Sequence, residues 1–150
     1  MVQTRTQATY TTPTTGNGVE ITPLNITVTP KKAGNMVILE WVIHGEAYND
    51  NVFLVTRNGT LLPGATDASN NIWAGIATPD YEGDQNSTPM TKTIKIADTN
   101  SLSTPSTYAL LIRGSAGTAY AFTLNQAIGS AGQAAYETGL SSVTATEVYQ

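Results

Sequence analysis

Short runs of alternating apolar and polar residues, separated by turn residues, constrain this chain more than any other feature of its sequence. Residues 24–29 place apolar side chains at every second position, and residues 91–96 alternate likewise with Ile94 and Ile96 on one face. Such runs are typical of half-buried strands, because successive side chains of a strand point to opposite faces. Asn58-Gly59 follows the β-rich run 51–57 and is a strong hairpin signal. The pattern therefore predicts an all-β chain.

The same reasoning, applied along the chain, predicts eight or nine strands. We expect them over residues 24–29, 36–44, 51–57, 60–62, 72–76, 91–96, 106–113, 119–125 and 141–148. The run 36–44 is apolar at both parities, that is, at its odd and its even positions, except at Glu40. Both faces of this strand would then be covered, so we place it at the centre of a sheet. Strands joined by loops of uneven length favour a two-sheet antiparallel jelly-roll sandwich over a barrel of tight hairpins.

The chain has 150 residues, which suits a single domain with a core of its own. Residues 1–18 differ from the rest, because they are rich in Thr and Gln and carry almost no apolar side chains to bury. Without such burial the entropy of ordering is not compensated. We therefore predict a flexible N-terminal arm over residues 1–18 and a folded domain over residues 19–150.

The charged residues exclude several partners. Lys and Arg together number 7, too few for a basic surface that binds nucleic acid or anionic lipid. No apolar run approaches the roughly 20 residues that span a bilayer, so we expect no membrane insertion. The first residues contain no apolar signal region, and we expect no export by the standard secretion route. The absence of cysteine excludes zinc–thiolate sites and thiol nucleophiles.

Catalytic signals are weak. His44 is the single histidine and no G-x-S-x-G motif accompanies it, so a satisfied histidine at a strand end is the better interpretation. Asp80, Glu82 and Asp84 alternate in a loop, as ligands of hard cations do, but the positions that follow do not complete a calcium loop. The scattered glutamates specify no glycosidase pair. We expect no enzyme activity, no catalytic residues, no metal and no cofactor.

Aromatic residues in polar stretches are the candidates for recognition of a ligand. Trp73 and Tyr81 flank the long polar loops and could stack on a glycan, whereas Trp41 lies inside the predicted central strand and favours the core. Packing in the core or between subunits remains the alternative for these rings.

The low charge content indicates self-association. Charged residues make up 12% of the chain, against about 25% in a typical globular protein. The runs 106–113 and 119–125 are apolar at both parities, through Ala109, Leu111 and Ala121. Sheets that are apolar on both faces need a second covering layer. A symmetric homo-oligomer supplies it economically.

Three segments near the C-terminus resemble the closing strands of small jelly-roll domains in tailed-bacteriophage virions. They read STYALLIR at 106–113, TAYAFTLN at 118–125 and YETGLSSVTATEV at 136–148. The segments VEITPL at 19–24 and NVFLVTRNG at 51–59 resemble the opening strands of the same group. These domains are similar in fold to tumour-necrosis-factor-like trimers, and the resemblance covers residues 19–150.

The resemblance implies a homotrimer with its inner sheets around a threefold axis. It carries the trimer interface onto seven residues of this chain: Tyr108, Leu110, Ile112, Tyr120, Phe122, Val143 and Ala145. Because the chain has no shaft, it looks more like a capsid decoration (cement) protein, made in the host cytoplasm, that binds the major capsid protein on the phage head. In that case Arg5, Tyr10 and Pro13 of the arm are its candidate docking residues. The alternative is a receptor-binding tip of a tail fibre or spike that recognises host surface glycan or protein through residues 64–71 and 77–90.

Overall fold

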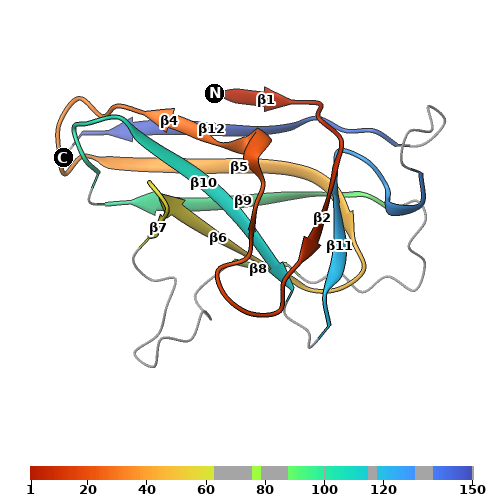
Figure 1. Cartoon of the computed structure of the whole chain (residues 1–150). Helices are drawn as coiled ribbons and strands as arrows, with labels where there is room; N and C mark the ends of the chain where they lie inside the picture. Colours follow the sequence, from red (N-terminus) through yellow and green to blue (C-terminus); the bar gives the residue numbers. More distant parts are fainter. Residues whose placement is uncertain (63–75, 79–87, 100, 115–117, 131–136, 150) are drawn as a thin grey trace.

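The computed structural model describes residues 1–62, 76–78, 88–99, 101–114, 118–130 and 137–149. These residues form two antiparallel β-sheets and two single-turn 3-10 helices, η1 (Thr22–Leu24) and η2 (Ile128–Ser130). Figure 1 shows the long strands of the two sheets crossing in front of one another. The prediction of an all-β chain with two antiparallel sheets is confirmed.

The first sheet, called sheet A, is built around one long strand. Its members are β1 (Val2–Thr4), β2 (Ala8–Thr12), β5 (Met36–Ala47), β9 (Met90–Asp98), β11 (Tyr120–Leu124) and β12 (Ser141–Val148). On one side β5 pairs with β9. On the other side it pairs with β12 along residues 36–42 and with β11 along residues 45–47. The expected central position of residues 36–44 is confirmed.

The second sheet, called sheet B, is centred on β10. It contains β3 (Val19–Glu20), β4 (Ile26–Val28), β6 (Asn51–Arg57), β7 (Thr60–Leu61), β8 (Ile76–Thr78) and β10 (Ser106–Gly114). β10 pairs with β6 on one side and with β3 and β4 on the other. Asn58 (φ 50°) and Gly59 (φ 79°) connect β6 to β7 with the positive φ angles of a tight hairpin turn, as their sequence predicts.

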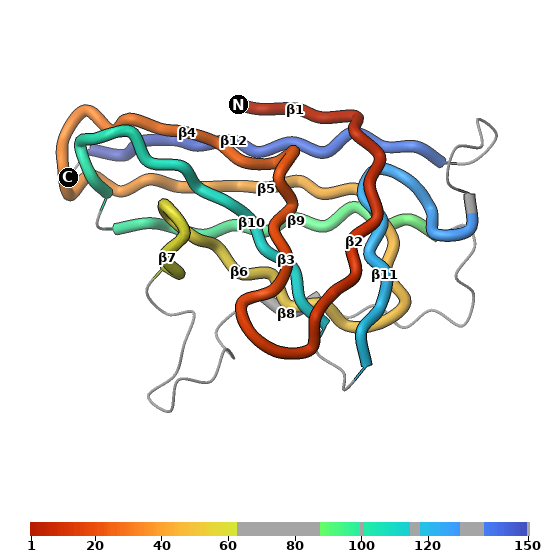
Figure 2. Tube along the Cα trace, viewed as in Figure 1, coloured from red at the N-terminus to blue at the C-terminus, as the bar shows by residue number. Residues whose placement is uncertain are grey.

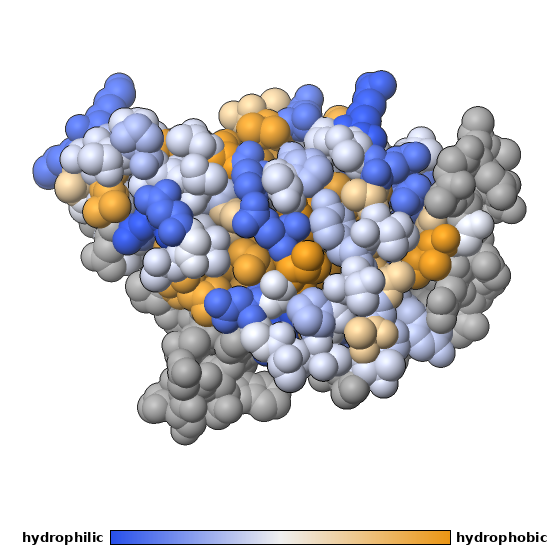
Figure 3. Space-filling model, in the orientation of Figure 1, coloured by the Kyte–Doolittle hydropathy of each residue, from blue (hydrophilic) through white to orange (hydrophobic). Residues whose placement is uncertain are grey.

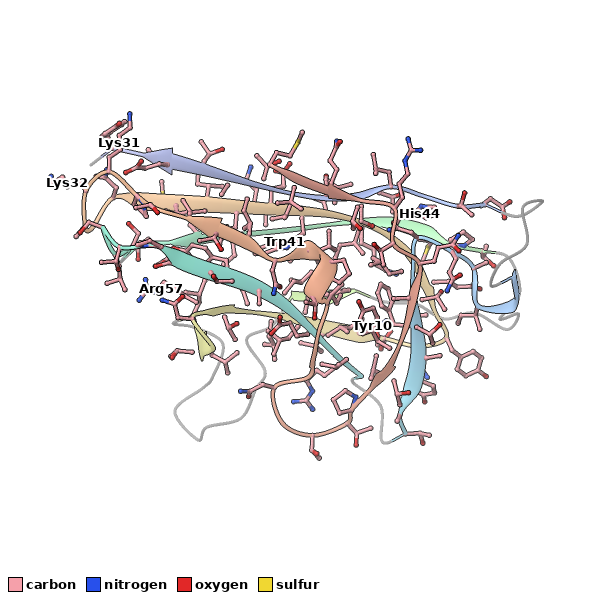
Figure 4. The ribbon with its side chains drawn as sticks, turned by 45° about the horizontal axis from the view of Figure 1, so that its top comes forward. Tyr10, Lys31, Lys32, Trp41, His44 and Arg57 are labelled. Atoms are coloured by element: carbon pink, nitrogen blue, oxygen red, sulfur yellow. The ribbon has the colours of Figure 1, made fainter. Side chains whose placement is uncertain are left out.

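The core lies between the sheets and is filled by the strongly apolar parity of each strand. In β5, Val37, Leu39, Trp41 and Ile43 are fully buried while their neighbours are only partly covered. Figure 4 shows Trp41 pointing from β5 toward the second layer. Its indole Nε1 donates to the carbonyl of Leu24, 3.0 Å away, so the one polar atom of this large ring is satisfied.

A buried ion pair also connects the two sheets. Asp98 of β9 accepts hydrogen bonds from Arg57 of β6 at 2.6 Å and from the hydroxyl of Tyr108 of β10 at 2.8 Å. Asp98 and Tyr108 are both buried, whereas Arg57 keeps contact with solvent. Burial and the adjacent carboxylate raise the pKa of Tyr108, which therefore remains a hydrogen-bond donor. This cluster fixes the position of β9 over β6 and β10.

Residues 1–18 do not form the separate flexible arm predicted from their composition. Val2–Thr4 pairs with β12, and Ala8–Thr12 pairs with β11, so two segments of this stretch are strands of sheet A. Figure 2 shows the N-terminal tube following first β12 and then β11. Hydrogen bonds between backbones hold these strands in the sheet, and such pairing requires few buried side chains.

The other face of sheet B carries a second, smaller apolar cluster. Leu54, Ala109 and Leu111 are buried there, with Val52 and Leu61 packed against them. The second apolar parity of residues 106–113 is thus covered within one chain and does not require a partner. On the face seen in Figure 3, pale residues of intermediate hydropathy separate small orange patches, and strongly hydrophilic residues stand apart from one another.

Candidate interaction surface

The side of sheet A that faces away from the core is the candidate functional surface, because its long central strand remains partly exposed. Met36, Ile38, Glu40, Val42 and His44 alternate with the buried positions of β5 and are each only partly buried. They form a stripe along the strand, and three of the five side chains are aliphatic or Met. A half-exposed apolar stripe on a long strand is unlike the polar outer face of an ordinary antiparallel sheet.

Threonines flank this stripe on both sides. We call the whole surface the outer face of sheet A. Besides the stripe on β5 it comprises Ser142, Thr144, Thr146 and Val148 of β12, and Thr91, Thr93, Lys95 and Ala97 of β9. The register sets these residues opposite one another in rows. Short Thr and Ser side chains leave a level surface and lose little rotamer entropy when they are covered.

A shallow hollow of about 300 Å³ lies in the middle of the outer face of sheet A. Its lining residues are Ile38, Glu40, Lys95, Thr144 and Thr146. Lys95 Nζ is 3.3 Å from Glu40 Oε2, and both side chains remain largely exposed. An exposed pair of this kind adds little to the stability of the chain, so its main effect is to place one positive and one negative charge side by side on a mostly neutral surface.

Some of the large apolar side chains that remain exposed lie beside the strands of the same surface. Among the described residues six are recorded: Met1 75%, Tyr48 36%, Met90 39%, Leu102 42%, Leu140 44% and Tyr149 64% exposed. Four of them adjoin the strands of the outer face. Met1 precedes β1, which borders β12; Leu140 and Tyr149 flank β12; and Met90 begins β9. Leu140 and Tyr149 lie at opposite ends of β12, so these side chains border the outer face at separate points and do not form one cluster.

His44 lies at one end of the outer face of sheet A, with its ring packed against neighbouring residues. Its Nδ1 lies 3.3 Å from Thr91 Oγ1, and Nε2 is buried without a hydrogen-bond partner among the described residues. Gly139 covers the ring, and burial lowers the pKa of His44, while Glu137 raises it and Lys92 lowers it. Figure 4 shows His44 at this end of the strand. The interpretation of a packed strand-end histidine is consistent with this environment.

The seven residues expected at the trimer interface do not face outward. Tyr108, Leu110, Ile112, Phe122 and Val143 have no exposed surface and belong to the core of a single chain. Ala145 packs partly against that core. Tyr120 is partly buried at the end of the sandwich, where its ring lies 5.6 Å from that of Tyr48. This assignment is wrong because the most apolar parity of each strand fills the space between its own two sheets.

Two sets of predicted residues lie outside the described residues. They are Trp73 and Tyr81, the candidates for surface recognition, and the acidic trio Asp80, Glu82 and Asp84. The loops 64–71 and 77–90 of the receptor-binding alternative also lie outside the described residues, except for residues 77–78 and 88–90.

The three candidate docking residues of the N-terminal stretch are held in sheet A or beside it. The ring of Tyr10 lies 6.3 Å from that of Phe122, and the carbonyl of Pro13 accepts a hydrogen bond from Gly114. Arg5 lines a second hollow of about 270 Å³ together with Gln7 and residues 138–140. Of the three, only Arg5 is exposed, so Tyr10 and Pro13 are positioned for intrachain packing.

Most of the scattered glutamates have structural partners. Glu46 is buried and accepts a hydrogen bond from the backbone N–H of Ile128. Two others accept hydrogen bonds from asparagine side chains outside the strands. Glu20 accepts from Asn25 at 2.6 Å, and Glu147 accepts from Asn35 at 2.7 Å. No three His, Asp or Glu side chains within the described ranges come together in a way that could hold a metal ion.

Asn125 is a structural centre that the sequence pattern did not reveal. It adopts a positive φ of 58°, and its Nδ2 donates to the carbonyls of Thr4 at 3.1 Å and Thr6 at 3.0 Å. Ser141 Oγ donates to its Oδ1 at 2.7 Å. The residue thus ties the N-terminal stretch to the ends of β11 and β12. Its only local signal is the tolerance of Asn for left-handed backbone at the end of a strand.

Comparisons with protein-family models and with curated proteins find no match for this chain. In the part of the chain that the structure describes, no helix has the length and hydropathy needed to cross a bilayer.

Proposed function

We propose that this chain is a structural protein of a tailed-bacteriophage virion, a homotrimeric jelly roll that decorates the capsid. Its action is mechanical. Burial of apolar surface holds three copies together, and the trimer bridges neighbouring copies of the major capsid protein on the head. The proposal rests on the resemblance of residues 19–150 to such domains and on one structural observation, the half-exposed apolar outer face of sheet A.

The path of the chain supports the jelly-roll assignment. From β4 to β10 the chain alternates between the layers: β4 lies in sheet B, β5 in sheet A, β6 with β7 and β8 in sheet B, β9 in sheet A and β10 in sheet B. The last two strands, β11 and β12, both lie in sheet A. As a result, β12 lies between β1 and β5, and β10 lies between β4 and β6. Neighbours that are distant in sequence are expected of Greek-key winding.

The dimensions of the outer face of sheet A support its use as an interface between copies. From Met36 to His44 the strand β5 is about 27 Å long, and the three strands β12, β5 and β9 are about 14 Å wide, which gives a flat area of roughly 400 Å². A standard interface takes about 800 Å² from each partner. The exposed side chains of Met1 and Leu140, which adjoin this face, extend it toward that size.

Light scattering tests the assembly directly. A trimer has three times the chain mass of 15.8 kDa. Ile38→Glu places a charge in the half-exposed stripe, so we expect a folded monomer. The control is Thr60→Glu on β7 of sheet B, which is exposed and should remain trimeric. A monomeric wild-type chain at micromolar concentration, or an Ile38→Glu variant that stays trimeric, contradicts the proposal.

A reconstruction of the virion tests the location. Trimeric density on the capsid surface is the expected result. Density at the end of a tail fibre or spike supports the receptor-binding alternative. Absence of the chain from purified virions contradicts both virion roles. The proposed self-association through sheet A would then be the only part of the proposal that still stands.

A further inference from the structure

The N-terminal strands are the one part of sheet A that contributes almost nothing to the core. No apolar side chain within residues 1–18 is fully buried, and the buried core begins at Ile21. Val2 and Tyr10 only pack against its margin. The stretch is therefore held mainly by backbone pairing and polar contacts, and it can leave its edge without opening the space between the sheets.

The polar contacts nevertheless make this edge selective for this particular strand. Thr12 Oγ1 accepts from the backbone N–H of Tyr120 at 3.2 Å and donates to its carbonyl at 3.1 Å. The amide of Asn125 holds the bend between β1 and β2 through two carbonyls. Any copy of this chain carries the same strand and can make all of these contacts.

A short connector joins the N-terminal strands to the rest of the chain. It runs from Pro13 to Gly18, and Gly16 (φ 71°) and Gly18 (φ 94°) adopt backbone conformations that favour glycine. Arg113 fixes it from outside by donating to the carbonyls of Thr14 at 2.9 Å and Gly16 at 3.3 Å. Six residues reach about 20 Å when extended, so the connector can cross to a neighbouring subunit.

We propose that residues 1–12 are exchanged between copies, so that each N-terminal stretch completes sheet A of its neighbour. The inference rests on the proposed trimer. β1 borders β12, whose outer side belongs to the proposed interface, and Met1 is 75% exposed there. Copies held together at that face present each stretch to an identical edge at high effective concentration. Exchange then preserves every contact of the edge and changes only the path of the connector.

Disulfide trapping decides between pairing within a chain and pairing between chains, because the chain has no cysteine of its own. Gln3 and Ser142 are register partners in β1 and β12, at a spacing that suits a disulfide. Gln3→Cys/Ser142→Cys is oxidised, denatured and run on a non-reducing gel. The control is Thr27→Cys/Thr107→Cys, whose hydroxyls are 3.0 Å apart within sheet B. The control should run as a single chain.

Exchange predicts that the first variant is recovered as covalent multimers of up to three chains, a threefold gain in mass, at both low and high protein concentration. A second pair, Thr11→Cys/Ala121→Cys, reports on β2 and β11 in the same way. Single chains from both pairs in a sample that light scattering shows to be trimeric overturn the exchange and leave the trimer intact. Thiols that stay free in both pairs also overturn it, and a monomeric wild-type sample refutes the trimer itself.

Discussion

Removing one hydroxyl from the cluster between the sheets tests how the two layers are held together. Tyr108→Phe keeps the fully buried ring and deletes only the hydrogen bond to Asp98. Arg57 still pairs with the carboxylate, so the variant does not leave Asp98 as an isolated buried charge. A hydrogen bond to a charged group contributes about 1.5–3 kcal/mol, and we expect the free energy of unfolding to fall by that amount.

The loss corresponds to a decrease in Tm of roughly 3–12 °C for a chain of this length. Urea unfolding measures the loss of free energy. All variants are compared at one fixed protein concentration, because association between copies shifts the apparent stability. Tyr149→Phe is the control: its ring is 64% exposed, so we expect a change within about 0.5 kcal/mol. Asp98→Ala removes the common acceptor of Arg57 and Tyr108 and should cost more, about 3–5 kcal/mol. A Tyr108→Phe variant as stable as Tyr149→Phe refutes the reasoning.

Three further predictions concern the end of sheet A at which His44, Gly139 and Asn125 lie. Burial lowers the pKa of His44 below 6.5, so the unfolded chain binds the proton first and the free energy of unfolding should fall as pH drops from 6.5 through the folded-state pKa. The urea midpoint, measured as a function of pH, should change less in His44→Gln than in the wild-type chain. Gly139→Ala should cost about 1–3 kcal/mol in thermal unfolding, because its methyl group overlaps the ring of His44. Asn125→Asp replaces the donor that holds Thr4 and Thr6 with a carboxylate oxygen, and hydrogen exchange should become faster in residues 1–12 than in the rest of sheet A.

Strand positions were predictable where side-chain alternation is strong. The bounds of β6 (Asn51–Arg57) and β12 (Ser141–Val148) agree with the predicted runs, and β5 extends the predicted run by three residues to Ala47. These strands have one face in the core, so burial imposes a period of two on their residues. The same signal failed for residues 1–12. Their order depends on pairing with β11 and β12 and on the side chain of Asn125, which is distant in sequence.

The parity of the strands explains why the predicted interface was misplaced. Alternation tells which residues share a face, but both the core and an interface between subunits call for apolar side chains. Where the two compete, the stronger parity fills the core, as Tyr108, Leu110 and Ile112 do. An interface is then to be sought in the weaker parity of the same sheet. In β5 that parity holds Ile38 and Val42, whose apolar character also indicated the central position of the strand.

The low charge content has two structural causes that act on different sheets. In sheet B, the second apolar parity of β10 is covered within the chain, so Ala109 and Leu111 give no reason for a partner. In sheet A, the corresponding parity of β5 lies between rows of Thr and remains half exposed. The proposed self-association therefore rests on sheet A alone. If Ile38→Glu and Val42→Glu both leave the mass of the wild-type assembly unchanged, the shared surface lies elsewhere and the argument from parity fails.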